Sequence, residues 1–378
     1  MLKPPNDNRR FVCITGGHLS PALCVLEKIE ERDPKWNVVW IGRMTALEGD
    51  SQESEEYRIV TQKGIPFLPL VTGRISRGAG IGTLALSVFQ IPNGFFRAYQ
   101  YLVRYRPSLV ISFGGYIAFP VAIMAYLLGI PVVTHEQTDE LGLANRIISF
   151  FATRVYTSSP GGIRRNSEKF LYTGIPVRRL IYTPPQQPSF PCELDTPIVY
   201  VTGGSTGATS LNALVFPLVH EMTKSFTLIH QTGRGDYGRG IRVKKSLPAA
   251  LRNRYLVSAY FSESDVSWIY KHAALVVGRS GASTVAEVAA TGTVALFIPL
   301  PWSAGDEQEK NAMRLVDGGS AKRLFQHDTT SEILLKEISH MVTNNKAYRE
   351  KARVVASIFD RQGAEHIVKD IETMIVPS

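Results

Sequence analysis

Short apolar runs alternate along the chain with segments of helical periodicity. The runs are VVWIG (38–42), LVISFGG (109–115), PVVTHEQ (131–137), PIVYVTGG (197–204), FTLIHQTG (226–233), LVVGRSG (275–281) and VALFIPLP (294–301). Between them, segments such as LSPALCVLEKIEER and ASTVAEVAATG repeat apolar residues at helical spacing. Buried strands that alternate with helices are typical of parallel sheets covered by helices. The pattern therefore predicts an α/β protein.

One strand–loop–helix pattern occurs twice. FVCITGGHLSPALCVLE (11–27) and VYVTGGSTGATSLNALV (199–215) each read as a strand, a Thr-Gly-Gly turn and a helix. The proline-rich segment 183–197 has no helical or strand period and is interpreted as a linker. The sequence thus predicts two Rossmann-like domains, 1–182 and 198–378, with parallel sheets facing a central cleft. The last helix could pack back on the N-terminal domain.

Composition and charge limit the kind of protein and the kind of partner that the sequence allows. The 378 residues are 44% hydrophobic and 20% charged, which excludes a disordered chain. The net charge is +9, and residues 1–185 hold most of it, with 21 Lys and Arg against 14 acidic residues. An anionic partner is therefore expected for the first half.

The cysteines and the apolar runs bear on the compartment. Cys13, Cys24 and Cys192 lack C-x-x-C spacing, which favours a reducing compartment over a disulfide framework or a metal cage. The longest apolar run, 119–133, is interrupted by Gly129 and is too short to span a bilayer. A cytoplasmic protein is expected, soluble or attached only to a membrane surface.

Two glycine-containing loops are candidates for phosphate binding. ITGGHLSP (14–21) ends a strand at a tight turn, where backbone amides can approach a phosphate; the alternative is a turn with no ligand. GRSGASTVAE (278–287) predicts a helix starting near Ser283, with Glu287 placed to accept from ribose hydroxyls. A capping box of Thr284 and Glu287 is the alternative. Neither of the two Thr-Gly-Gly loops, in 11–27 and 199–215, has the G-x-G-x-x-G spacing, which disfavours a nicotinamide dehydrogenase.

Two further segments carry polar residues, one in a loop after a strand (135–146) and one at a predicted helix (305–312). His135 and Glu136 are expected to be structural hydrogen-bonding groups rather than catalysts. Gln308 and Asn311 share one helical face and could read sugar hydroxyls, whereas a helix start capped by Asp306 is the alternative.

Taken in order, these segments resemble glycosyltransferase family 28, whose MurG-type members add N-acetylglucosamine to lipid I in peptidoglycan synthesis. The resemblance is carried by TGGHLSPAL, FGGY, HEQ, GLANR, TGIPVR (173–178), GGSTGA (203–208), RSGASTVAE and DEQEKNA. It implies the two-domain glycosyltransferase B (GT-B) fold. It also implies an undecaprenyl-diphosphate-linked acceptor on the N-terminal half and UDP-N-acetylglucosamine mostly on the C-terminal half.

The resemblance implies roles for individual residues. His18 is the expected general base, or the group that orients the acceptor hydroxyl. Arg178 and Ser205 are expected beside the diphosphate, and Phe261 beside the uracil. The full set of expected substrate-binding residues is Thr15, Gly16, Gly17, Thr138, Asn145, Arg178, Ser205, Phe261, Ala282, Ser283, Thr284, Val285, Ala286, Glu287 and Gln308.

Two departures from the family pattern concern specificity. Cys13 and Ile14 replace glycines of the first loop, so the loop is expected to approach the diphosphate less closely. Thr138 replaces an asparagine that contacts the donor, and it lacks the paired donor and acceptor of an amide. A changed sugar or acceptor is one consequence to consider.

The chain contains no Asp-x-Asp, a usual means of holding a divalent metal on a nucleotide diphosphate. We therefore expect metal-independent, inverting transfer without a cofactor, in which helix N-termini and Arg178 stabilise the departing UDP. Alternatives are a related transferase with another acceptor, a UDP-sugar epimerase, or a non-catalytic UDP-sugar or membrane binding protein.

A basic and apolar stretch in the first half predicts a surface of the protein that binds a membrane. From Tyr57 to His135 there is no Asp or Glu, and seven Lys or Arg lie among the apolar residues. Such a stretch suits peripheral attachment to the cytoplasmic face of the cell membrane. The alternative is that its apolar residues pack in the core and its arginines are solvated. No nucleic-acid motif accompanies the charge, so nucleic acid is not an expected partner.

Overall fold

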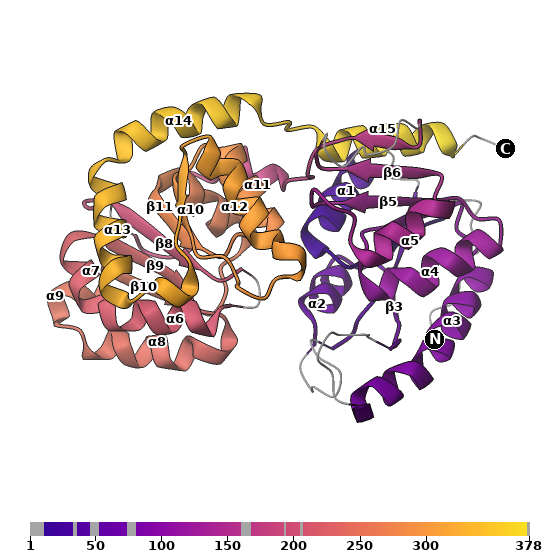
Figure 1. The fold of residues 1–378 in the computed structure, drawn as a ribbon, viewed down its shortest axis with the longest axis horizontal. Helices are drawn as coiled ribbons and strands as arrows, with labels where there is room; N and C mark the ends of the chain where they lie inside the picture. The colour runs from indigo at the N-terminus through magenta and orange to yellow at the C-terminus, as the bar shows by residue number, and fades with distance from the viewer. Residues whose placement is uncertain are drawn as a thin grey trace. The chain divides into compact units, whose positions relative to one another are not determined.

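The chain folds as two compact units in the computed structural model (Figure 1). The structure describes residues 11–32, 36–45, 53–73, 81–159, 168–192, 194–204 and 207–375, and only the backbone of 81–89 and of Ala304. The first unit runs to Pro176 and includes the chain from Gln362 onward; the second unit runs from Val177 to Arg361.

The first unit contains a parallel sheet with the strand order β3-β2-β1-β4-β5-β6-β7 in the described part of the chain. Its strands are β1 Phe11–Thr15, β2 Asn37–Gly42, β3 Phe67–Pro69, β4 Leu109–Ser112, β5 Val132–Glu136, β6 Arg154–Thr157 and β7 Phe170–Tyr172. From β1 the chain adds strands toward one edge of the sheet as far as β3, and from β4 onward it adds them toward the other edge. Open parallel sheets bind their ligands at such a point, here between β1 and β4.

Helices cover both faces of this sheet. They are α1 Leu19–Arg32, α2 Glu55–Gln62, α3 Ile81–Tyr105, α4 Gly115–Leu127, α5 Leu143–Phe151 and α15 Gly363–Met374. Alternate residues of β1 enter different cores: Phe11 and Cys13 pack with α3, α4 and α5, whereas Val12 and Ile14 pack with α1 and α15. Burial on both faces explains the continuous apolar runs in the sequence.

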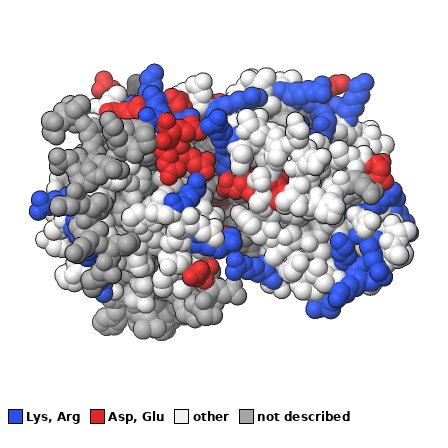
Figure 2. Space-filling view, turned by 180° about the vertical axis from the view of Figure 1, so that it is seen from behind, with Lys and Arg blue, Asp and Glu red and all other residues white. Residues whose placement is uncertain are grey.

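The last helix, α15, belongs to the first unit. Ile367, Val368 and Ile371 are fully buried in the core that contains Val12 and Ile14. Lys28 and Arg32 of α1 form ion pairs with acidic side chains of α15, including Arg32 Nε to Glu372 Oε1 at 3.1 Å. Figure 2 shows basic and acidic side chains gathered over these two helices. The end of the chain thus completes the domain in which the chain begins.

The second unit contains another parallel sheet, with the order β10-β9-β8-β11-β12-β13 among the described residues. Its strands are β8 Ile198–Thr202, β9 Thr227–Gln231, β10 Tyr255–Ser258, β11 Ala273–Gly278, β12 Ala295–Phe297 and β13 Ala321–Arg323. Its α-helices are α6 Thr209–Val215, α7 Val219–Ser225, α8 Arg234–Ser246, α9 Ala249–Arg252, α10 Glu263–His272, α11 Ala282–Thr291, α12 Glu307–Asp317, α13 Ser331–Thr343 and α14 Asn345–Ile358. The predicted α/β class with two parallel sheets is confirmed.

The proline-rich segment after Val177 packs on α10. The backbone N–H and the hydroxyl of Ser189 both donate to the carboxylate of Asp265 at 2.7 Å. The ring of Phe190 contacts the rings of Phe261 and Trp268, with centroids 5.2 and 6.0 Å away. The segment is therefore anchored to the second unit through Ser189 and Phe190, by hydrogen bonds and ring contacts.

None of the described helices combines the length and the apolar character needed to cross a membrane.

The position of α15 leads to a stability prediction. Ile371→Ala leaves a cavity in the core of the first unit, and we expect the free energy of unfolding to fall by about 2–5 kcal/mol. Ile358→Ala, at a position that is 80% exposed on α14, should change it by less than about 0.5 kcal/mol. Urea unfolding followed by circular dichroism measures both; equal effects would contradict the packing of α15.

Candidate substrate-binding sites

The two glycines of the first loop are required by neighbours inside the protein. A Cβ on Gly17 would clash with the carbonyl oxygen of Gly114, and a Cβ on Gly16 would clash with the carboxylate of Glu56. Gly114 follows β4 and adopts a φ of 72°, which favours glycine. The loops after β1 and β4 therefore meet closely, and this brings Gly16, Gly17 and His18 together at the carboxyl edge of the sheet.

The Glu56 carboxylate has two partners on the neighbouring strand and loop. Its Oε1 accepts from Trp40 Nε1 at 2.7 Å, and its Oε2 accepts from Arg43 N at 3.1 Å. Burial raises the pKa of Glu56, and these two hydrogen bonds partly oppose the rise. The sequence analysis did not single out Glu56, because its partners lie on β2 and beside Gly16.

Glu136, at the end of β5, has a buried carboxylate that accepts four hydrogen bonds. Its Oε1 accepts from Thr138 N at 3.1 Å and from Thr138 Oγ1 at 2.7 Å. Its Oε2 accepts from Gly142 N and from Asn145 Nδ2, each at 2.9 Å. The carboxylate is 3% exposed and has two donors on each oxygen. It fixes the loop between β5 and α5.

Thr138 and Asn145, two of the expected substrate-binding residues, are part of this hydrogen-bonding cluster. Asn145 Oδ1 accepts from Thr134 Oγ1 at 2.7 Å, and its Nδ2 also donates to His135 O at 3.1 Å. In the structure the amide of Asn145 thus has protein partners on both atoms. Thr15 Oγ1 differs: it is buried at the end of β1 and has no hydrogen-bond partner among the described residues.

The two histidines near Glu136 are both biased toward the neutral form. Burial lowers the pKa of His18, and the negative charge of Glu136 opposes this shift. Burial also lowers the pKa of His135 to about 4. His135 Nε2 lies 3.3 Å from Gly174 O and 3.2 Å from Ser158 Oγ, and the side chain is 1% exposed. His18 is only half-buried, so its side chain is more accessible than that of His135.

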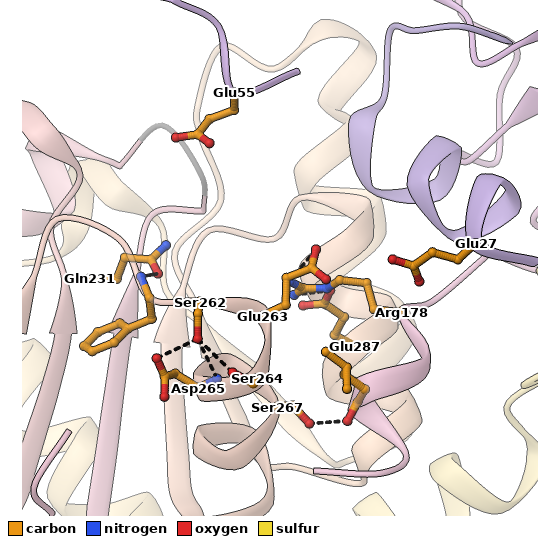
Figure 3. A network of polar contacts seen from close by, with 12 residues as sticks. Glu27, Glu55, Arg178, Gln231, Ser262, Glu263, Ser264, Asp265, Ser267 and Glu287 are labelled. Carbon is orange, nitrogen blue, oxygen red and sulfur yellow. Dashed lines mark hydrogen bonds and ion pairs between the residues drawn. The ribbon is translucent and has the colours of Figure 1, made fainter. Parts of the chain in front are cut away.

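In the second unit, Arg178 forms a close ion pair with Glu287. Arg178 Nε and Nη2 lie 2.8 and 2.5 Å from Glu287 Oε1, and Nη1 lies 3.7 Å from Glu263 Oε1. Figure 3 shows Arg178 between these two carboxylates. Burial opposes the charge of Arg178, but Glu287 and Glu263 outweigh burial and raise its pKa. The structure thus brings together two of the expected donor-binding residues, 109 positions apart in the sequence.

Helix α11 begins at Ala282, one residue earlier than predicted. Its N-cap is Gly281, and no side chain caps the helix. The alternative capping box of Thr284 and Glu287 is wrong, because both residues lie inside the helix and Glu287 binds Arg178. The backbone N–H groups from Gly281 to Thr284 therefore have no side-chain cap, whereas Val285 N already donates to Gly281 O at 3.0 Å. Open amides at a helix start are suited to an anion.

Arg279, directly before this turn, is a buried cation that the sequence analysis did not identify. It is 7% exposed, and its Nη1 donates to Ile298 O at 2.7 Å while its Nη2 donates to Ser210 Oγ at 2.6 Å. Its Nε has no hydrogen-bond partner among the described residues. Burial lowers the pKa of Arg279. An arginine directly after a buried apolar strand is the sequence feature that could have revealed it.

Gln308 supports the loop after β12. Its Oε1 accepts from Leu300 N at 3.0 Å, and its carbonyl oxygen accepts from Ser280 Oγ at 2.7 Å. Asn311, on the same helical face as predicted, donates to Ser280 O at 3.2 Å. The alternative cap by Asp306 is wrong, since Asp306 makes no side-chain cap; the N–H of Gln308 donates to Ser303 Oγ at 3.3 Å.

The remaining expected residues are placed as follows. Phe261 follows β10 and is 7% exposed, with its ring against Phe190 and Tyr200. Ala286 is buried inside α11 and Ser283 lies in its first turn. Ser205 lies outside the described residues.

Both halves of the chain match models of one family. The glycosyltransferase family 28 N-terminal domain matches residues 12–157, and the glycosyltransferase family 28 C-terminal domain matches residues 198–370. The chain belongs to glycosyltransferase family 28. This family 28 membership confirms the resemblance found in the sequence.

Relatives within family 28 match over most of their length. A protein of Polaromonas naphthalenivorans (strain CJ2) is 33% identical over 338 residues, which cover 85% of each chain. A protein of Aeromonas hydrophila subsp. hydrophila is 30% identical over 362 residues, covering 95% of this chain and 94% of the relative. Both are named UDP-N-acetylglucosamine--N-acetylmuramyl-(pentapeptide) pyrophosphoryl-undecaprenol N-acetylglucosamine transferase.

Solved structures confirm the GT-B fold of this family 28 chain. MurG of Acinetobacter baumannii superposes with a TM-score of 0.67 and 26% identity, covering 96% of this chain and 99% of that one. A UDP-GlcNAc 2-epimerase from Neisseria meningitidis superposes with a TM-score of 0.64 at 11% identity, covering 96% and 100%. Transferases and epimerases thus share the fold, and the fold alone does not separate the two activities.

Proposed function

We propose that this family 28 protein transfers N-acetylglucosamine from UDP-N-acetylglucosamine to an undecaprenyl-diphosphate-linked N-acetylmuramoyl-pentapeptide acceptor (lipid I), giving lipid II in peptidoglycan synthesis. The observation that carries the proposal is the match of both halves to family 28, together with relatives named for this reaction. Epimerases share only the fold at 11% identity, which favours the transferase over the epimerase.

The second unit would hold the donor. The uncapped start of α11 offers hydrogen-bond donors to a diphosphate, and the buried Arg279 adds positive charge beside it. Glu287, held by Arg178, would accept from ribose hydroxyls, and Gln308 would contact the sugar. Phe261 would lie beside the uracil of the donor.

The first unit would hold the acceptor, with His18 as the general base. A half-buried histidine with a lowered pKa is neutral at physiological pH and can take the proton of the attacking hydroxyl. Direct attack forms the new glycosidic bond as the bond to UDP breaks, which inverts the anomeric centre. Backbone amides and arginines, rather than a divalent metal, would stabilise the negative charge on UDP.

UDP release from UDP-N-acetylglucosamine, with and without a lipid I analogue, tests this function. We expect release to require the acceptor and to continue at the same rate in EDTA, because protein groups stabilise the leaving group. Loss of turnover in EDTA would contradict metal-independent transfer. Conversion of the donor without acceptor would instead support an epimerase, and donor binding without any turnover would support a binding protein.

The role of His18 predicts a pH dependence. Because burial lowers its pKa below the ordinary value of 6.5, the acid limb of kcat/KM should lie below pH 6.5, where the base becomes protonated. His18→Ala should lower kcat by about 10²–10⁴-fold and remove this limb. His340→Ala, at an exposed position on α13, is the control and should keep the wild-type profile. An unchanged profile in His18→Ala would refute its role as the base.

We also propose that the first unit attaches to the cytoplasmic face of the membrane through α3, α4 and α5, which pack side by side. Large apolar side chains are exposed on all three helices, including Phe96 at 58%, Leu127 at 66% and Phe150 at 68%. Exposed arginines lie among them, such as Arg97 and Arg146. Apolar insertion plus attraction to anionic lipid supports reversible binding. Arg74 and Arg77, part of the predicted stretch, lie outside the described residues.

Sedimentation with anionic vesicles tests this surface. The double variant Leu127→Glu/Phe150→Glu places two charges in the apolar layer and should weaken vesicle binding by about tenfold or more. The matched control is Val354→Glu/Ile358→Glu, which alters residues 63% and 80% exposed on α14 of the second unit. Equal binding by the two double variants would contradict the assignment.

A further inference from the structure

The buried amide of Gln231 joins two loops at the carboxyl edge of the second sheet. Gln231 ends β9 and is 4% exposed. Its Oε1 accepts from Phe261 N at 3.2 Å and from Tyr200 Oη at 3.3 Å. Its Nε2 donates to Gly204 O at 3.0 Å and to Thr202 Oγ1 at 3.4 Å. The amide therefore uses both N–H groups and both acceptor positions.

These partners determine which way the amide faces. The oxygen must face Phe261, whose backbone N–H can only donate, and the nitrogen must face Gly204, whose carbonyl can only accept. In the sheet, β9 lies between β8 and β10, so Gln231 stands between the loops that follow those two strands. Figure 3 shows its side chain beside the segment that leads to Ser262.

The two loops correspond to opposite ends of the donor under the proposed function, on which this inference rests. Gly204 belongs to the glycine turn after β8, expected beside the diphosphate. Phe261 precedes α10 and is expected beside the uracil. A ligand that contacts both loops binds well only when their separation matches its length, whereas a ligand that contacts one loop does not depend on the separation.

We propose that Gln231 is a positioning residue that sets the separation of the uracil-facing and diphosphate-facing loops, and that it thereby makes the site selective for a nucleoside diphosphate over a nucleoside. A purely structural amide would behave differently. Its replacement would lower stability and weaken UDP and uridine to the same extent.

Substitutions can break the two sides of this amide separately. Gln231→Glu keeps an oxygen facing Phe261 N and Tyr200 Oη but places the second oxygen against Gly204 O, where a donor is needed. Gln231→Met removes both sides. Thr202→Val leaves Gln231 in place and removes the hydroxyl that accepts from Gln231 Nε2 and from Gly204 N.

The matched control lies at the other end of the same strand. Thr227 begins β9, is 2% exposed, and its hydroxyl lies 2.8 Å from Thr196 Oγ1. Thr227→Val removes a partly buried hydrogen bond at the amino edge of the sheet. This variant shows how a loss of stability alone affects ligand affinity, because the loops at the carboxyl edge of the sheet are unchanged.

Isothermal titration of the full-length chain with UDP and with uridine, together with Tm measurements, tests the inference. We expect Gln231→Glu to weaken UDP by about tenfold, because a buried carbonyl loses its donor, and to change uridine by less than about threefold. Thr202→Val should show the same preference with a smaller effect. Gln231→Met should weaken both ligands, and Thr227→Val should lower Tm and change neither affinity.

Unchanged UDP affinity in Gln231→Glu and Thr202→Val, or equal losses for UDP and uridine in both, would overturn the inference while leaving the proposed function standing. A wild-type chain that binds no UDP would overturn the proposed function and this inference with it.

Discussion

Parallel strands bring their carboxyl ends to one edge of a sheet, and each unit of this protein depends on how the loops at that edge are held together. Loops that meet there remove backbone groups and carboxylates from water, so each needs a partner within the protein. In the first unit the loops after β1 and β4 touch through Gly17 and Gly114, and Glu136 ties the loop after β5 with four hydrogen bonds. In the second unit Gln231, at the end of β9, joins the loops that follow β8 and β10.

The elements that create these edges could be predicted from the sequence because their patterns are local. Apolar runs marked the strands, and glycine turns marked where the strands end. The set of partners around Glu136 is also nearly local, since Thr138 and Asn145 lie within nine residues of it. The resemblance to a family predicts a shared site for residues far apart in the sequence, such as Arg178 and Glu287, which no local pattern connects.

The rest depends on partners far apart in the chain, which periodicity does not reveal. The capping box was a reasonable local alternative for Glu287, but an arginine 109 positions earlier binds that carboxylate instead. Gln231 ends a strand of ordinary appearance, and its importance lies in contacts with Gly204 and Phe261. The return of α15 to the first unit depends on a complementary apolar surface that only the folded core provides.

The two sheets are alike in topology, so the division of roles in the proposed reaction comes from the partners of two carboxylates. Glu136 accepts only from uncharged donors, so no positive charge offsets its carboxylate. Its negative charge therefore opposes the lowering of the pKa of His18 by burial, which favours proton uptake by that base. Glu287 is held by Arg178, whose positive charge offsets the carboxylate. Arg178 also pairs with Glu263, so its single charge reduces the negative potential of two carboxylates. An oxygen of Glu287 can then accept from a sugar hydroxyl with weaker repulsion of the anionic diphosphate of the same ligand. One carboxylate suits a site that removes a proton, and the other suits a site that receives an anion.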